Sequence, residues 1–168
     1  MYGRYGPREE SKYDVAQVCL NGHLINQRTQ RFPQHNKKHC SNCGAATINA
    51  CPKCEASIRG EYGVGALYTI PVPAFCYEFG AAYPWTESRL QAAHDLTIES
   101  DLAEADKKTL LDSIDGLAKN TPQSDVLATR VQKIFRRVGE VAPKALRQLF
   151  VEISSETAKK ILLDGRPI

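Results

Sequence analysis

The hydrophobic and polar positions follow two different patterns along the chain. From about residue 86 onward, apolar residues recur at spacings of three and four, which is the period of amphipathic helices. Before residue 84, apolar residues form only short runs, such as 13–18 and 66–72, among glycines, prolines and cysteines. Such runs are typical of short strands and tight turns. The pattern therefore predicts a small α+β protein in which the strands come first and the helices follow.

The helical pattern from residue 86 onward predicts about four helices. Their expected ranges are 86–98, 102–118, 122–138 and 143–163. Thr86 and Thr121 can cap the first and third helices, proline follows Thr121 at the first helical position, and Gly139 and the segment 164–167 provide stops. The apolar stripes of the last two helices are Leu127, Val131, Ile134, Phe135 and Val138, and then Leu146, Leu149, Phe150, Ile153, Thr157 and Ile161. These stripes must pack on one another, so we expect an all-α domain.

Three regions follow from these patterns. Residues 1–12 lack any period and are expected to be a flexible tail. Residues 13–83 are expected to form a zinc-ribbon module, and residues 84–168 a helical domain. The segment 1–12 contains neither an apolar run nor a small-residue cleavage site, and no stretch has the roughly 18 apolar residues of a membrane-spanning helix. We therefore expect a cytoplasmic protein that has no contact with a membrane.

Cysteine chemistry separates the two halves more sharply. The chain has six cysteines and four histidines. All six cysteines and three of the histidines lie between residues 19 and 76, which leaves only His94 in the helical half. In a reducing cytoplasm, cysteines at short spacing hold metal more often than they form disulfides. The seven candidate metal ligands are Cys19, His23, Cys40, Cys43, Cys51, Cys54 and Cys76.

The spacing of these ligands predicts zinc. Two ligands separated by two or three residues can face one ion from a tight turn, and tetrahedral zinc takes four ligands from two such turns. In the sequential pairing, which we favour, Cys19, His23, Cys40 and Cys43 hold one ion, and Cys51, Cys54 and Cys76 form the other group. In the nested pairing, Cys40, Cys43, Cys51 and Cys54 form a four-thiolate site. His35 and His39 lie in a polar loop and are expected to face solvent.

Four segments of the chain carry a resemblance to a family. They are AQVCLNGHLIN, HCSNCGAATINACPKCEASIRG, PVPAFCYEFGAAYPWTES and ISSETAKKIL. Together they resemble an uncharacterised family of bacterial proteins, a domain of unknown function that pairs N-terminal zinc ribbons with C-terminal helices. The resemblance covers nearly the whole chain from about residue 13. It implies a further turn of the form FCxxCG, but Phe79 stands here where the second cysteine would be.

This substitution puts the second metal site in doubt, because three thiolates do not close a structural zinc site. The second group is then empty, completed by Glu78 or His94, or left with an open position. The resemblance implies decay of a structural site, with Phe79 as core. One zinc is therefore expected. An open zinc can activate water, but the sequence shows no catalytic constellation beside it, so we expect a protein that is not an enzyme.

Charge leaves two classes of function open. The net charge is only +3, but 95–125 is acidic, whereas 126–150 carries Arg130, Lys133, Arg136, Arg137, Lys144 and Arg147 against Glu140. The favoured interpretation is a protein-interaction or scaffold module that binds another protein or a second copy. The alternative is a nucleic-acid-binding accessory protein that uses this basic helix and the knuckle-loop residues Arg28, Arg31, Lys37, Lys38 and Lys53. The tyrosines look scattered, which predicts no stacking platform. No small-molecule substrate is evident.

Overall fold

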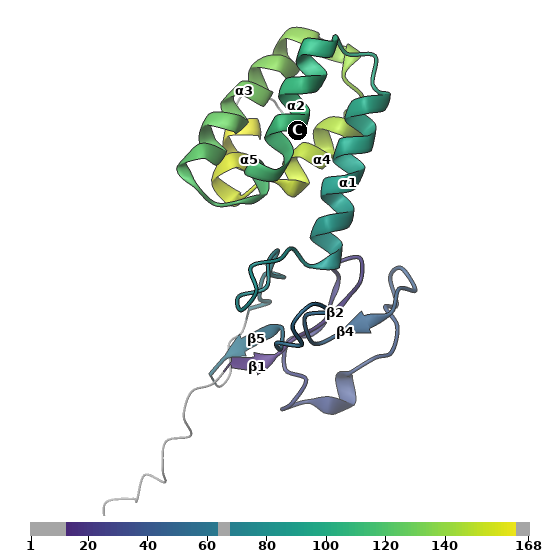
Figure 1. Cartoon of the computed structure of the whole chain (residues 1–168). Coiled ribbons are helices and arrows are strands. Elements are labelled where there is room, and N and C mark those ends of the chain that lie inside the picture. The colour runs from purple at the N-terminus through teal and green to yellow at the C-terminus, as the bar shows by residue number, and fades with distance from the viewer. Residues whose placement is uncertain (1–12, 64–67, 164–168) are drawn as a thin grey trace, which may run out of the picture. The chain divides into compact units, whose positions relative to one another are not determined.

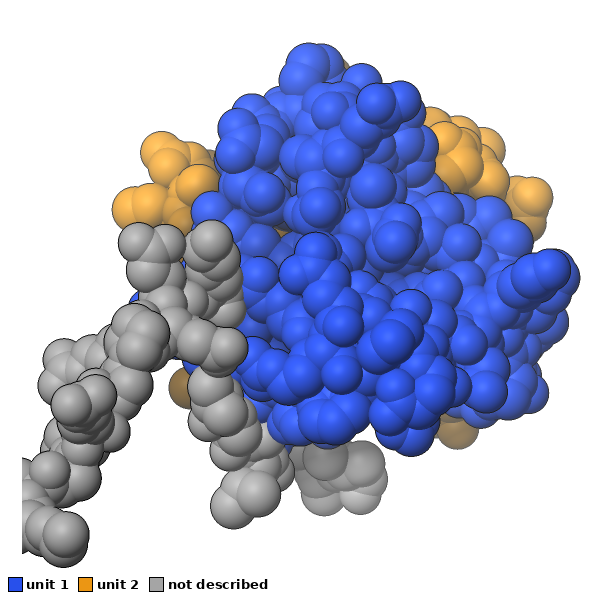
Figure 2. Space-filling view, turned by 90° about the horizontal axis from the view of Figure 1, so that it is seen from below, with its two compact units in different colours: residues 1–85 blue, residues 86–168 orange. Residues whose placement is uncertain are grey.

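The computed structural model describes residues 13–63 and 68–163, so the expected tail at 1–12 lies outside the described residues. The chain divides into two compact units, residues 1–85 and residues 86–168, which Figure 2 colours blue and orange. The division falls beside Pro84, where the sequence pattern changes. The fold class predicted from the sequence, short strands followed by helices, is confirmed (Figure 1).

The first unit contains two small antiparallel sheets. Strand β1 (Tyr13–Val15) pairs with β5 (Arg59–Tyr62). Strand β2 (Gln17–Cys19) lies between β3 (Leu24–Asn26) and β4 (Thr47–Ile48), and a 3-10 turn, η1, spans Pro33–His35. Burial alternates along the predicted run 13–18, where Asp14, Ala16 and Val18 are buried. This period of two is the strand signature, and it directs one side of β1 and β2 into the unit.

The other predicted run, 66–72, forms no strand over the part of it that the structure describes, residues 68–72. Pro71 and Pro73 flank Val72 and have no N–H to donate to a ladder. The side chain of Gln27 takes the place of a neighbouring strand. Its amide nitrogen donates to the Tyr68 carbonyl at 3.2 Å, and its oxygen accepts from the Ile70 amide at 3.1 Å.

The core of the first unit is small. Its buried members are Ala16, Val18, Cys51, Ile58, Cys76, Tyr83 and Trp85. Tyr83 and Trp85 stack with ring centroids 4.7 Å apart, and the indole N–H of Trp85 donates to the Pro73 carbonyl at 2.9 Å. Two of these seven residues, Cys51 and Cys76, are candidate metal ligands, so the core and the second ligand group share residues.

The helices are α1 (Pro84–Glu99), α2 (Glu104–Ala118), α3 (Pro122–Val138), α4 (Lys144–Ile153) and α5 (Glu156–Leu163), and a 3-10 turn, η2, covers Gly139–Val141. The cap predicted for α3 is present: the Thr121 amide donates to the Ser124 hydroxyl at 3.2 Å, and Pro122 takes the first helical position. Gly139 ends this helix with φ +53. Helix α1 begins at Pro84 rather than at Thr86, in keeping with the preference of proline for the first turn.

The last predicted helix, 143–163, is two helices. Ser154 has extended backbone angles, and its hydroxyl donates to the Phe150 carbonyl at 2.6 Å. The Ser155 amide bonds the Leu117 carbonyl at 2.9 Å, and its own carbonyl accepts from the Lys159 amide. Serine competes for backbone groups in this way and favours helix ends, so the pair stops α4 and starts α5. Thr157, expected on the apolar stripe, is exposed as a result.

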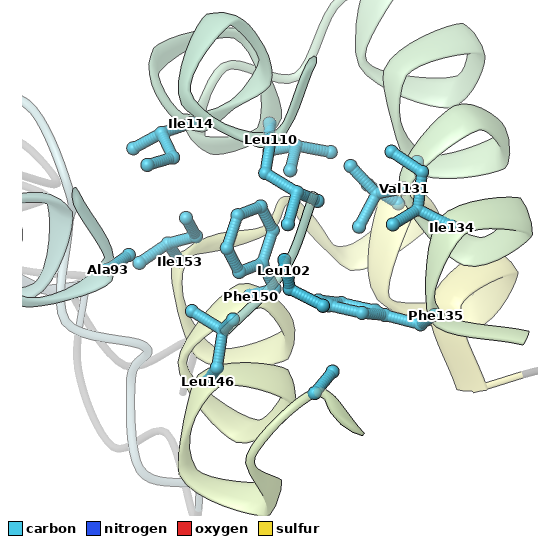
Figure 3. Packing of buried hydrophobic residues seen from close by; sticks show 14 residues of the cluster. Ala93, Leu102, Leu110, Ile114, Val131, Ile134, Phe135, Leu146, Phe150 and Ile153 are labelled. Carbon is cyan, nitrogen blue, oxygen red and sulfur yellow. The ribbon is translucent and has the colours of Figure 1, made fainter. Parts of the chain in front are cut away.

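The core of the second unit lies among α1–α5 (Figure 3). Its buried members include Leu110, Val131, Leu146, Phe135 and Phe150, and the last two meet edge to face with centroids 5.4 Å apart. These residues are those that the helical spacing placed on one face of each helix. Among the described residues, the helices are too short or too polar to cross a membrane.

Candidate metal centre

Three hairpin turns of the first unit are built alike, and they begin at Cys40, Cys51 and Cys76. In each turn the carbonyl of the cysteine accepts from the amide four residues on at 2.8 Å, and its amide donates to the carbonyl five residues on at 2.8–2.9 Å. The amide seven residues on donates to the carbonyl two residues before the cysteine, at 3.2, 2.9 and 3.0 Å respectively. The sequence motifs at 40–43 and 51–54 therefore form knuckles, and the segment 76–79 forms the same knuckle without a second cysteine.

Each knuckle needs a left-handed residue four positions after its first cysteine. Gly44 and Gly80 fill this position with φ +71 and +70. Glu55 fills it in the middle knuckle with φ +61, and within the described residues it is the one non-glycine residue with positive φ. A side chain in this region costs on the order of 1–2 kcal/mol, so the rest of the turn must hold Glu55 there.

The turn at Cys19 is a shorter version of the same device. The Gly22 amide donates to the Cys19 carbonyl at 2.8 Å, and the Cys19 amide donates to the His23 carbonyl at 3.0 Å. Gly22 has φ +87. The His23 amide also approaches the Cys19 sulfur at 3.2 Å. The turn thus directs a thiol and an imidazole toward the same point.

The seven predicted ligands fall into two groups. Cys19, His23, Cys40 and Cys43 form the first, and Cys51, Cys54 and Cys76 form the second; within each group the ligand atoms lie within 4.8 Å of one another. This is the sequential pairing. In the nested pairing Cys40 and Cys43 would join Cys51 and Cys54, which lie in the other group.

The spacing within the first group fits a tetrahedral ion. Metal–sulfur bonds of about 2.3 Å and metal–nitrogen bonds of about 2.1 Å give tetrahedral edges of about 3.8 Å between sulfurs and about 3.6 Å between sulfur and nitrogen. The Cys19 and Cys43 sulfurs are 3.8 Å apart, and His23 Nδ1 lies 3.4 Å from the Cys19 sulfur and 3.6 Å from the Cys40 sulfur. A disulfide would bring two sulfurs to about 2.05 Å. The group could therefore hold one metal ion with all four positions filled by the protein.

The second group has three thiols, and the Cys54 and Cys76 sulfurs lie 3.6 Å apart. Among the described residues of the first unit, no carboxylate or imidazole joins these thiols, so the suggestion that Glu78 completes the site is wrong. Phe79 is 62% exposed. The interpretation that Phe79 fills the missing position as core is therefore also wrong, because its side chain lies largely in solvent.

Backbone hydrogen bonds lower the pKa of two of the thiols, Cys43 and Cys76. The amide of Ala45 and then the side chain of Asn21, 3.4 Å from the sulfur, lower the pKa of Cys43 to about 6. The Phe79 amide lowers the pKa of Cys76 to about 7. Burial raises the pKa of Cys19 above its usual value. Since the thiolate is the form that binds metal, the knuckle amides reduce the competition from protons at Cys43 and Cys76.

Sequence reasoning missed Tyr83, which is buried beside the second group. Burial, and then the neighbouring thiols, raise the pKa of Tyr83 well above its usual value, so its phenol is neutral. Its place could have been inferred only from the repeat of the hairpin, since Ile58 holds the same position after Cys51.

Sequence reasoning also missed a surface cluster. The tyrosines Tyr13, Tyr62 and Tyr77 are exposed but not scattered: Tyr13 and Tyr77 lie against Arg59, and Tyr62 lies against Tyr13. The Arg59 guanidinium lies 3.9 Å from the Tyr77 ring centroid and 5.1 Å from that of Tyr13, and the Tyr13 and Tyr62 rings are 4.9 Å apart. These four residues are called the tyrosine–arginine cluster below. The pairing of β1 with β5 brings Tyr13, Arg59 and Tyr62 together, and Tyr77 joins them from the third knuckle.

Comparison with known proteins gives a family but no characterised relative. No curated protein and no solved structure matches the chain. A family described as uncharacterized protein conserved in bacteria, DUF2321, matches residues 12–162. The match spans both units and confirms the resemblance carried by the ribbon motifs. The chain therefore belongs to this family of conserved bacterial proteins.

Proposed function

We propose that this chain is a non-catalytic zinc protein of the bacterial cytoplasm whose first unit binds another protein or a second copy of the chain. The first metal group supports zinc, because three thiolates and one imidazole at tetrahedral spacing are a ligand set of structural zinc sites. Four protein ligands leave no position for substrate. In this proposal the metal supports a rigid surface and takes no part in a reaction.

The tyrosine–arginine cluster is the observation that carries the proposal. Tyrosine and arginine are enriched in protein interfaces and dominate their binding energy, since they combine large contact area with hydrogen-bonding groups. In this unit they are already stacked on one another, so little side-chain freedom remains to be lost on binding. Tyr77 belongs to the third knuckle, which links the surface to the second group of thiols.

The helical unit supports the same choice. The basic stripe of α3 was the main argument for nucleic acid, but Arg137 forms an ion pair with Asp106 of α2. Arg147 donates to the carbonyls of Phe135 and Ala142 at 3.1 and 3.3 Å, and so it hydrogen-bonds backbone carbonyls at and just after the end of α3. Part of the positive charge is therefore used inside the unit and is not available to track phosphates.

The proposal is tested by placing a photo-reactive phenylalanine analogue at position 62 in the native cell. Tyr62 is 54% exposed and lies in the cluster. Tyr68 is the matched control position, because it is 65% exposed and is not one of the four cluster residues. We expect a discrete protein adduct from position 62 that is absent from position 68. Arg59→Ala should weaken it, since Arg59 holds the rings together.

The adduct also distinguishes the partners. A mass equal to two copies of the chain identifies self-association, and any other discrete protein mass identifies a partner. Equal adducts from both positions, no adduct, or an adduct only with nucleic acid would each contradict the proposal.

A second candidate function, nucleic-acid binding, is favoured by a hollow of about 720 Å³ beside the first metal group. Its lining includes Arg28, Phe32, His35, Lys37 and His39, and no carboxylate. Phe32 could stack on a base while the cations meet phosphate. Arg28 is partly neutralised by the buried Glu61, which weakens this candidate.

The test of the second candidate is binding of single-stranded RNA at increasing salt. Lys37→Glu lies in the hollow, and Lys108→Glu, exposed on α2 and not part of the hollow, is the control. Nanomolar binding that falls steeply with salt and is lost only in Lys37→Glu would replace the interaction proposal, because each neutralised phosphate adds about 0.7 to the logarithmic slope on single strands.

A further inference from the structure

The third knuckle keeps its shape without its second ligand. Its three backbone hydrogen bonds match those of the knuckles at Cys40 and Cys51, and Gly80 has the required positive φ. Position 79 therefore occupies the place that Cys43 and Cys54 hold in the other two turns. A phenylalanine there leaves the backbone frame intact and removes only the fourth sulfur.

No other side chain takes that fourth place. Phe79 lies largely in solvent, and over the described residues of the first unit, 13–63 and 68–85, no imidazole, carboxylate or further thiol lies within 4.8 Å of all three sulfurs. Tyr83 lies in the same buried cluster as Cys51 and Cys76. Cys54 and Phe79 are exposed. The fourth coordination position of this group is therefore open to water.

Charge favours a neutral ligand there. Three thiolates around a divalent ion carry a net charge of −1, so a fourth anion would add repulsion close to the metal. A neutral donor adds none. Water and imidazole are the neutral donors that divalent zinc accepts at ordinary bond lengths.

We infer that Cys51, Cys54 and Cys76 form an open metal site that holds a divalent tetrahedral ion with three thiolates and one exchangeable neutral ligand, water in the isolated chain and an imidazole where one is supplied. The first group, with four protein ligands, is the closed site of the same molecule. The two sites therefore differ in exchange chemistry, and the inference does not depend on the partner proposed above.

The test uses the full chain loaded with cobalt(II), whose visible absorption reports the ligands of a tetrahedral site. Thiol reductants would themselves bind the open position, so a phosphine keeps the cysteines reduced. Imidazole is the probe. We expect two cobalt ions per chain and a saturable shift of the absorption from one of them as imidazole is added.

Two substitutions at one exposed position supply the matched control. Phe79→Cys completes the third knuckle and should abolish the shift, because a fourth thiolate closes the site. Phe79→Ser leaves the position open and should retain the shift. Both replace a largely exposed side chain, so circular dichroism and the cobalt stoichiometry should show that each variant folds and loads.

Three results would overturn the inference. A chain that binds only one cobalt shows that the second group holds no metal. Two cobalt ions without any imidazole shift show that the fourth position is blocked, for example by the Tyr83 oxygen. An equal shift in Phe79→Cys places the response at the first group, where imidazole would be displacing His23.

Discussion

Removal of metal should unfold the first unit and leave the helices standing. Among the described residues, the apolar cluster of the first unit has only seven buried members, two of them cysteines of the second metal group, whereas the helical unit has a large apolar core without any cysteine. A structural zinc site contributes about 10–16 kcal/mol at neutral pH. That is comparable to the roughly 5–15 kcal/mol of a whole small domain, so we expect the first unit to unfold when the metal is removed.

Two spectroscopic signals of the chain follow the two units separately. Trp85 is the only tryptophan, and it is buried in the first unit, stacked on Tyr83 and bonded to the Pro73 carbonyl. Its fluorescence therefore follows the first unit. Far-ultraviolet circular dichroism follows the helices instead. Because α1 starts at Pro84, fraying of its first turn would remove only about 5% of the helical signal.

The assay adds a strong chelator and records both signals during one titration. We expect the Trp85 emission to shift to the red as its ring meets water, while at least about nine tenths of the helical signal remains. Added zinc should reverse the change. Joint loss of both signals would refute the reasoning, since the helices would then need the metal unit as part of their core. An unchanged emission would show that the cysteines fold the unit without metal.

Two substitutions test local features of the fold. Gly60→Ala should destabilise the metal-loaded first unit by about 3 kcal/mol, measured by urea unfolding with Trp85 fluorescence. The reason is that the new Cβ would lie 2.4 Å from the backbone carbonyl oxygen of Gln27 and 2.8 Å from that of Asp14. The control Gly63→Ala meets open space and should cost only about 1 kcal/mol for its positive φ, so equal costs would contradict the packing argument. Arg147→Met should destabilise the helical unit by roughly 1.5–3 kcal/mol, measured by circular dichroism, since it removes charged hydrogen bonds to carbonyls at the end of α3. The exposed Lys144→Met should be near neutral, and an equal loss there would point to charge rather than to those bonds.

The helices and the metal ligands could be read from the sequence because both depend on local spacing. The three- and four-residue period predicted the buried faces of α2 and α3, and ligands two or three residues apart predicted the turns. The break at Ser154 was missed, since it depends on the bond from the Ser155 amide to the Leu117 carbonyl of another helix. A local pattern cannot reveal a competing partner that is distant in the sequence.

The tyrosine–arginine cluster was missed for the same reason. Tyr13 and Tyr62 face each other only because β1 pairs with β5, and that register depends on contacts between distant segments. Tyr77 joins them from the third knuckle through Arg59. In the sequence these residues look scattered. Single tyrosines are unremarkable on a surface, and the grouping of three with one arginine is the feature on which the interaction proposal rests.

Phe79 was the most informative misreading, because it shows that the knuckle backbone and its ligands are separate features. We expected the loss of a cysteine to turn that position into core, and the exposure of Phe79 contradicts this. The hairpin bonds at Cys40, Cys51 and Cys76 are the same whether the fourth residue of the turn is cysteine or phenylalanine. The shape of the knuckle backbone therefore depends on the backbone pairing and on the left-handed residue after the turn. The cysteines determine only how many positions around a metal the protein fills. A chain can thus change one ligand and open a site to exchange without rebuilding the unit that carries it.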